Sequence, residues 1–350
     1  MRRTSLAVTL GAILALTVTS CGDTAESDAD AEGGEASAEA QSLVLYSGRN
    51  EELIQPLIDT FSEETGIEVE VRYGDTAELA AQILEEGEGS PADVFLAQDA
   101  GALGAVAAED LFDELDAELL EQVPEAYRDT EDQWVGLSGR VRTLIYNTDT
   151  VDEADLPASV DELTGADYTG RVGVAPTNAS FQSFVTAHRE IEGEEQTQSF
   201  LDDLAANDPQ IREGNGEIVT DVAEGVLDMG LVNHYYLYSR AKELGEAPEE
   251  LNVANHLFSD GDVGSLVNVA GVGVLNSENP AAASLTEFML STEGQTYFAE
   301  ETAEYPLIEG VDGPEGMPSL EELDAPEIDL NQLDDLETSV EMIVESGLVG

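Results

Sequence analysis

The sequence predicts an α/β fold of two lobes with a central cleft and a hinge of two strands. Short apolar runs alternate with segments of helical periodicity in both halves of the chain, which is typical of parallel sheets covered by helices. Two further apolar runs, residues 143–146 and 267–275, flank the second set of elements. The chain can cross into a second lobe at the first run and return at the second.

The first half of the folded body begins near Leu43 and supplies three strands and three helices. The strands are predicted at residues 43–47, 67–71 and 93–97. The first helix, 51–65, has apolar residues at helical spacing, and the second, 75–86, opens on the capping pattern DTAE. A third helix is expected from about residue 100.

The second half repeats the alternation. Strands are predicted at 171–175 and 229–232, and helices at 181–191 and 235–244. Beyond Pro306 the chain is acidic and rich in loops, with a last helix near 336–345. We expect residues 43–142 and 269–350 to form the first lobe with the C-terminal tail, and residues 143–268 to form the second.

The N-terminus is typical of an exported lipoprotein. Arg2 and Arg3 precede a 13-residue apolar stretch, 6–18, that is too short for an ordinary membrane span. Residues 1–20 are predicted to be a signal peptide, and Cys21, the only cysteine, to be the lipidated residue. Residues 21–42 are acidic and would be a flexible tether. We therefore expect a protein anchored by lipid on the extracytoplasmic face of the membrane.

The charge of the chain limits the classes of partner. Among 350 residues there are 76 Asp and Glu against 12 Lys and Arg, a formal net charge of −64. Nucleic-acid binding through general electrostatics needs clustered basic residues, and the charge argues against it. A hydrophobic content of 42% still supports a packed core, so the acidity predicts a halophilic surface on a globular protein.

Polar loops after four predicted strands indicate where a ligand binds. They are residues 47–50, 98–101, 176–180 and 233–236. In open parallel sheets, ligands bind beyond the carboxyl ends of the strands. The last loop leads into Tyr235 and Tyr236, whose phenolate oxygens would suit a hard trivalent cation such as Fe(III). These tyrosines, with Tyr238, also fit an amphipathic core position.

Seven segments together resemble the ferric-ion-binding proteins of ABC iron importers. They are LYSGR (45–49), RYGDTAEL (72–79), SPADVF (90–95), QDAGAL (98–103), GLSGR (136–140), PTNASF (176–181) and NHYYL (233–237). The resemblance implies a type II periplasmic-binding-protein fold and iron held by Tyr235 and Tyr236. It also implies a synergistic carbonate, bicarbonate or phosphate, and an ABC permease with its ATPase as partners.

The remaining site residues are predicted partly from this resemblance. It matches Asn178 or Ser180, Asn215 and Asn233 to anion contacts. Many relatives have a histidine at the position of Asn50 and a carboxylate at that of Gln98, so these amides and Tyr73 are weaker metal candidates. Arginines are rare in this chain, and a bidentate guanidinium suits bicarbonate. Arg140 is therefore the main expected cationic contact, with Arg49 and Arg142 behind it; each can instead form a structural ion pair.

The leading hypothesis is a monomeric, non-enzymatic receptor that closes its lobes on Fe(III) and an anion. The same fold carrying an oxyanion, a polyamine or another metal is the alternative. A secreted hydrolase is disfavoured, because the chain contains no GxSxG elbow, phosphate-binding GxxxxGK loop or HExxH metal motif. His234, beside the tyrosines, is expected to be a residue of the helix entry.

Overall fold

The computed structural model describes residues 42–349. The predicted signal peptide, Cys21 and the predicted tether up to residue 41 lie outside the described part. Within it, no helix has both the length and the apolar character that a membrane crossing requires.

The first lobe is built on a mixed sheet with the strand order β2-β1-β3-β9-β4-β10. Strands β1, β2 and β3 run parallel, whereas β9 is antiparallel to both β3 and β4. The parallel part matches the β-α-β alternation of the sequence, since each parallel crossover needs a helix. The bounds are β1 Ser42–Ser47, β2 Glu68–Tyr73, β3 Val94–Ala97, β4 Trp134–Asn147, β9 Val267–Val274 and β10 Tyr305–Pro306.

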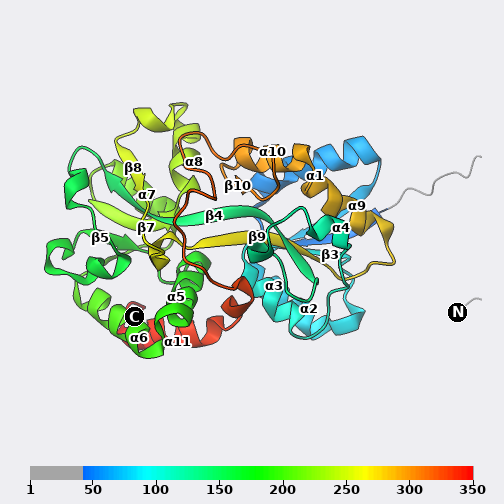
Figure 1. The fold of residues 1–350 in the computed structure, drawn as a ribbon, viewed down its shortest axis with the longest axis horizontal. Helices are drawn as coiled ribbons and strands as arrows, with labels where there is room; N and C mark the ends of the chain where they lie inside the picture. Colours follow the sequence, from blue (N-terminus) through cyan, green and yellow to red (C-terminus); the bar gives the residue numbers. More distant parts are fainter. Residues whose placement is uncertain (1–41, 350) are drawn as a thin grey trace, which may run out of the picture. The chain divides into compact units, whose positions relative to one another are not determined.

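The second lobe is built on a sheet with the order β6-β5-β7-β4-β8. Strand β5 runs parallel to β6 and β7, and β4 is antiparallel to β7 and β8. The bounds are β5 Val172–Val174, β6 Gln210–Ile211, β7 Met229–Asn233 and β8 Val253–His256. Strand β4 therefore belongs to both lobes, and Figure 1 shows it running between them beside β9.

Strand β4 is longer than predicted. The sequence indicated residues 143–146, but the strand covers Trp134–Asn147 and is buried throughout. Up to Val141 it pairs with β9, and from Arg142 onward it pairs with β7. The pairing changes sheet between these two residues, so the strand passes from the first lobe to the second at this point.

The helices cover both sheets, and most of them begin after the carboxyl end of a strand. In the first lobe they are α1 Glu51–Thr65, α2 Thr76–Glu86, α3 Ala100–Ala107, α4 Ala117–Leu120, α9 Pro280–Met289 and α10 Thr292–Glu301. In the second lobe they are α5 Ala179–Glu192, α6 Glu194–Ala206, α7 Asn215–Ala223 and α8 Tyr235–Leu244. The fold prediction of two α/β lobes is confirmed.

Local chemistry explains the helix bounds that the sequence predicted. Asn50 caps α1 by accepting a 2.8 Å hydrogen bond from the Glu52 N–H, and Gly66, at φ +73°, ends the helix. Asp75 caps α2 in the same way, with the N–H groups of Ala77 and Glu78 as donors.

The C-terminal segment connects the two lobes once more. The indole of Trp134 donates a 3.1 Å hydrogen bond to Asn331 in the first lobe. The last helix, α11 (Leu336–Ser346), then packs against α5 and α6 of the second lobe. There Arg189 of α5 forms a 2.9 Å ion pair with Asp335.

Candidate metal and anion site

A cleft of about 2330 Å³ lies at the carboxyl ends of the strands of both sheets. All four polar loops that the sequence indicated contribute to its lining. The first lobe contributes Gly48, Asn50 and Gln98, and the second contributes residues 177–180 and 233. The parallel strands β1, β3, β5 and β7 each end here, so helix N-termini and free backbone N–H groups point toward the same space.

Tyr235 and Tyr236 stand together at the start of α8, in the wall of the cleft. Their ring centroids are 4.5 Å apart and the planes are inclined by 26°, so the two rings stack. Tyr235 is only 7% exposed. Burial and the neighbouring Tyr236 raise the pKa of Tyr235 well above its ordinary value of 10. It is thus a neutral phenol until a strong positive charge arrives.

His234 precedes the pair and uses both ring nitrogens inside the protein. Its Nδ1 accepts a 3.2 Å hydrogen bond from the Val141 N–H, and its Nε2 donates to the Ala303 carbonyl at 2.7 Å. The ring is fully buried, and burial lowers the pKa of His234 to about 4. His234 is a neutral residue of the helix entry and has no nitrogen free for a metal.

A polar cluster lies where α5 and α7 begin. Asn178 caps α5, accepting from the Ser180 N–H at 3.1 Å and from its hydroxyl at 2.6 Å. The Asn215 amide, in the first turn of α7, donates to the Ser180 oxygen at 3.0 Å, and its own Oδ1 is buried without a partner. Two helix N-termini and three predicted anion contacts are therefore joined in one place.

Arg142 completes this cluster. Its Nη1 donates to the Ser180 oxygen at 3.1 Å and its guanidinium lies 5.6 Å and 5.5 Å from the ring centroids of Phe181 and Phe184. The side chain is buried and its Nε has no partner. Burial lowers the pKa of Arg142 to about 9, although Tyr236 and Tyr235 act in the opposite direction.

In the described part of the chain, no carboxylate forms an ion pair with Arg142. Among residues 42–349, ion pairs within 4.0 Å involve eight basic or histidine side chains, and Arg142 is not one of them. A buried cation is costly unless it is paired. In so acidic a chain, a carboxylate would have been easy to supply. The cluster is thus suited to an anion that comes from outside.

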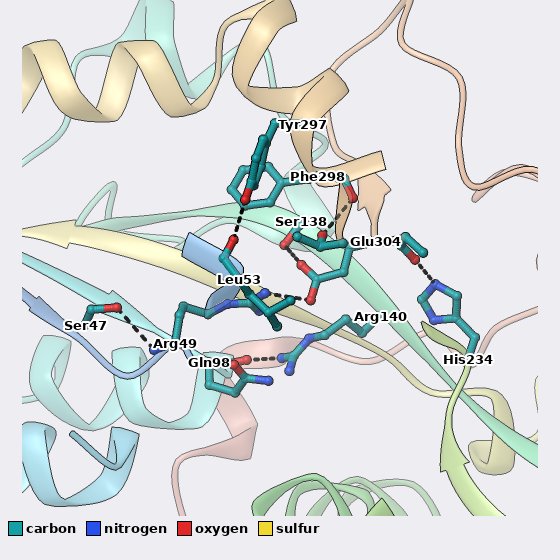
Figure 2. A network of polar contacts seen from close by, with 12 residues as sticks. Ser47, Arg49, Leu53, Gln98, Ser138, Arg140, His234, Tyr297, Phe298 and Glu304 are labelled. Carbon is teal, nitrogen blue, oxygen red and sulfur yellow. Dashed lines mark hydrogen bonds and ion pairs between the residues drawn. The ribbon is translucent and has the colours of Figure 1, made fainter. Parts of the chain in front are cut away.

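Arg49 and Arg140 line the cleft from the first lobe, opposite the cluster around Arg142 (Figure 2). Arg49 forms a buried ion pair of 2.7 Å with Glu304, whose carboxylate also accepts from the Ser138 hydroxyl at 2.5 Å. This pair argues against the predicted role of Arg49 as an anion contact. Arg140 donates to the Gln98 carbonyl, and its Nε has no partner although the residue is only 4% exposed.

The weaker metal candidates have other contacts. Asn50 uses its side-chain oxygen to cap α1. Tyr73 donates to Gln55 at 2.7 Å, and burial, with Glu51 and Asp59, raises its pKa to about 12. In the described part of the chain, no group of three or more His, Cys, Asp and Glu side chains could hold a metal ion. A metal in this cleft would therefore depend on tyrosine and on ligands from solution.

A family model for bacterial extracellular solute-binding proteins matches residues 89–330. The chain belongs to this family. Among its relatives, the Fe(3+)-binding periplasmic protein of Serratia marcescens is 32% identical over 320 residues, covering 91% of this chain and 94% of the relative. Iron uptake protein A2 of Synechocystis is 34% identical over 285 residues, covering 79% and 81%.

Solved structures of solute-binding proteins share the fold. Iron-bound HitA from Pseudomonas aeruginosa has a TM-score of 0.82 and 33% identity, covering 88% of this chain and 99% of that structure. The apo ferric ion-binding protein A of Pasteurella haemolytica has a TM-score of 0.78 and 27% identity, covering 88% and 98%. As a member of the solute-binding family, the protein binds and hands over a solute and is not an enzyme.

Proposed function

We propose that this solute-binding protein captures Fe(III) together with a synergistic anion and delivers the iron to an ABC importer. The observation that carries the proposal is the stacked pair Tyr235 and Tyr236 in the cleft wall. Relatives that align over most of the chain are named for ferric iron, which supports the same cargo in this protein.

The electrostatics of the tyrosines support a highly charged cation. A phenol with a raised pKa gives up its proton at neutral pH only to a strong Lewis acid, and two neighbouring phenolates repel one another unless a cation lies between them. Fe(III) is hard and trivalent and meets both conditions, whereas Zn²⁺ prefers nitrogen and sulfur ligands. Tyr73, Asn50 and Gln98 remain weaker candidates for further ligands from the first lobe.

The cluster around Arg142 supports carbonate, bicarbonate or phosphate as the anion. Arg142 supplies the charge, while Asn178, Ser180 and Asn215 supply hydrogen-bonding groups at two helix N-termini. Asn233, at the end of β7, lines the cleft just before the tyrosines in sequence. Arg140 would approach the anion from the first lobe when the lobes close.

The membrane anchor and the transporter partners are proposed from the sequence. We propose that Cys21 carries the lipid, that residues 21–42 tether a monomeric body to the membrane, and that a permease and its ATPase receive the iron. The proposed lobes are residues 43–142 with 269–350, which include the C-terminal tail, and residues 143–268; the last helix of the tail, α11, lies against α5 and α6 of the second lobe.

Iron binding can be tested by replacing both tyrosines. The wild-type protein with Fe(III) and bicarbonate is expected to show a visible tyrosinate-to-iron charge-transfer band, and Tyr235→Phe with Tyr236→Phe is expected to lose it. Tyr168→Phe is the matched control, because Tyr168 does not line the cleft and hydrogen-bonds the Asp155 carbonyl. Full colour and affinity in the double variant would refute the assignment.

An oxyanion as the cargo itself is the second candidate. The unpartnered Nε of Arg142 favours it, since an anion satisfies this donor without iron. Thermal shifts with phosphate, sulfate, spermidine and Fe(III) separate the two candidates. Stabilisation by an oxyanion alone, with none added by iron, would support the second.

A further inference from the structure

His234 belongs to the second lobe, and its imidazole ring hydrogen-bonds the hinge residue Val141 and Ala303 of the first lobe. Figure 2 shows the ring near the network of Arg49, Ser138 and Glu304. The residue lies between β7, which ends at Asn233, and α8, which begins with the tyrosine pair. The ring has no exposed surface and packs against Tyr305 of the first lobe, with 5.1 Å between ring centroids.

On one side, His234 holds the point where β4 passes from one sheet to the other. The His234 N–H donates to the Val141 carbonyl at 3.0 Å, and its Nδ1 accepts from the Val141 N–H at 3.2 Å. Val141 is the last residue of β4 that pairs with β9, and Arg142 is the first that pairs with β7. Both backbone groups of the hinge residue are therefore satisfied by His234.

On the other side, His234 reaches the first lobe. Its Nε2 donates to the carbonyl of Ala303 at 2.7 Å. Ala303 links α10 to β10 at φ +54°, a conformation that alanine rarely adopts. The next residue, Glu304, is fixed by Arg49 and Ser138. The acceptor of the His234 hydrogen bond is thus held by the framework of the first lobe.

We propose that His234 is a positioning residue, a buried pivot that fixes the start of α8, and with it Tyr235 and Tyr236, relative to the first lobe. Lobe motion can then occur around Val141 while the start of α8, in the second lobe, keeps its distance from Ala303 of the first lobe. Loss of the bond to Ala303 frees this end of the second lobe and speeds the release of cargo. The proposal rests on the proposed function only in its prediction for iron.

Two substitutions remove the hydrogen bonds of His234 to Val141 and to Ala303 one at a time. His234→Asn keeps an oxygen near the position of Nδ1, where it accepts from Val141, but has no donor that reaches Ala303. His234→Gln keeps a donor near the position of Nε2 but loses the acceptor for Val141. If His234 only filled the core, both variants would be destabilised to a similar degree. They would then release iron at the same rate.

The test combines iron release with amide exchange. In His234→Asn, transfer of iron to a chelator is expected to be about ten-fold faster than in wild type, because one buried hydrogen bond between the lobes is lost. The charge-transfer band should keep its wavelength, because the tyrosines are unchanged. In His234→Gln, iron release should stay close to wild type, while the Val141 amide exchanges faster.

The outcomes separate this proposal from the iron assignment. Wild-type iron release in His234→Asn, or equal acceleration in both variants in proportion to lost thermal stability, would overturn the pivot. A shifted band would also overturn it, since it would make His234 a ligand. If the wild-type protein takes up no iron, the proposed function fails, and hydrogen exchange of the apo protein still tests the pivot: Val141 must be less protected in His234→Gln alone.

Discussion

Arg49 and Arg142 are both buried arginines near the cleft, but only Arg49 has a carboxylate beside it. Glu304 neutralises Arg49 within the protein, so this pair serves the framework. Arg142 has hydroxyl and carbonyl partners and two aromatic rings, none of which carries a negative charge. The difference identifies which arginine is available for an external anion, and it is visible only in three dimensions.

Glu304→Gln is expected to destabilise the protein by about 3–5 kcal/mol at pH 7, since it leaves the Arg49 charge buried and unpaired. Burial alone would raise the pKa of Glu304, but Arg49, Arg140 and Ser138 outweigh it and hold the pKa below its ordinary value. The ionised Glu304 carboxylate therefore contributes fully to the free energy of unfolding at pH values above its pKa in the unfolded chain. This contribution is lost as the pH falls through the lower pKa of Glu304 in the folded protein.

Denaturant unfolding from pH 7 down to pH 3 measures this effect. The wild-type free energy of unfolding should fall more steeply in the acid range than that of Glu304→Gln, so the two curves converge. A constant difference across the range would show that Glu304 is not ionised in the fold.

The roles of some site residues can be predicted from the sequence, and those of others cannot. The tyrosine pair can be predicted, because its neighbours in sequence already place it at a helix start after a buried strand. The partners of His234 and Arg49 cannot, because Ala303 and Glu304 are 69 and 255 residues away along the chain. No local pattern marks Glu304 in a chain with 76 acids.

At the scale of elements, helices α1 and α8 have the predicted bounds. Asn50 caps the start of α1, and the left-handed glycines Gly66 and Gly245 end the two helices. Strand β4 extends well beyond its predicted range. Gly136, Gly139 and two arginines interrupt its apolar pattern, and only the pairing with β9 on one stretch and β7 on the other explains its 14 buried residues. Tertiary pairing overrides local propensity in this strand.

The caps of α5 and α9 provide a matched pair of variants. Asn178 and Asn279 each accept a 3.1 Å hydrogen bond from the N–H two residues later. Replacing either by alanine should cost roughly 1 kcal/mol of stability. Only Asn178→Ala should also weaken anion-dependent iron binding, because Asn178 belongs to the cluster with Ser180. Titration of iron at several bicarbonate concentrations measures this; equal iron affinities in both variants would remove Asn178 from the site.

For the whole molecule, the net charge of −64 is the dominant property. Loss of Arg2 and Arg3 with the signal would change it to −66, because residues 1–20 contain no acid. Charge of this size strains a compact state by self-repulsion, and salt screens it over a Debye length of roughly 10 Å at 0.1 M. The thermal midpoint should therefore rise with NaCl, and an unchanged midpoint from low to molar salt would contradict a halophilic surface.

The acidity is spread along the chain, whereas the proposed site depends on a few residues that are not acidic. Two stacked tyrosines and a buried arginine that has no ion pair among residues 42–349 lie in one cleft between two lobes. A cation attracted by general acidity would bind at many places on the surface. Iron held by the tyrosine pair must instead bind at a single place.

Anomalous diffraction at the iron edge, from crystals grown with Fe(III) and bicarbonate, tests this requirement most directly. We predict one strong peak in the cleft, in contact with the phenolate oxygens of both Tyr235 and Tyr236, and an anion beside Arg142 and Ser180. A peak bound only by surface carboxylates, or a cleft without iron at saturating metal, would contradict the proposed site.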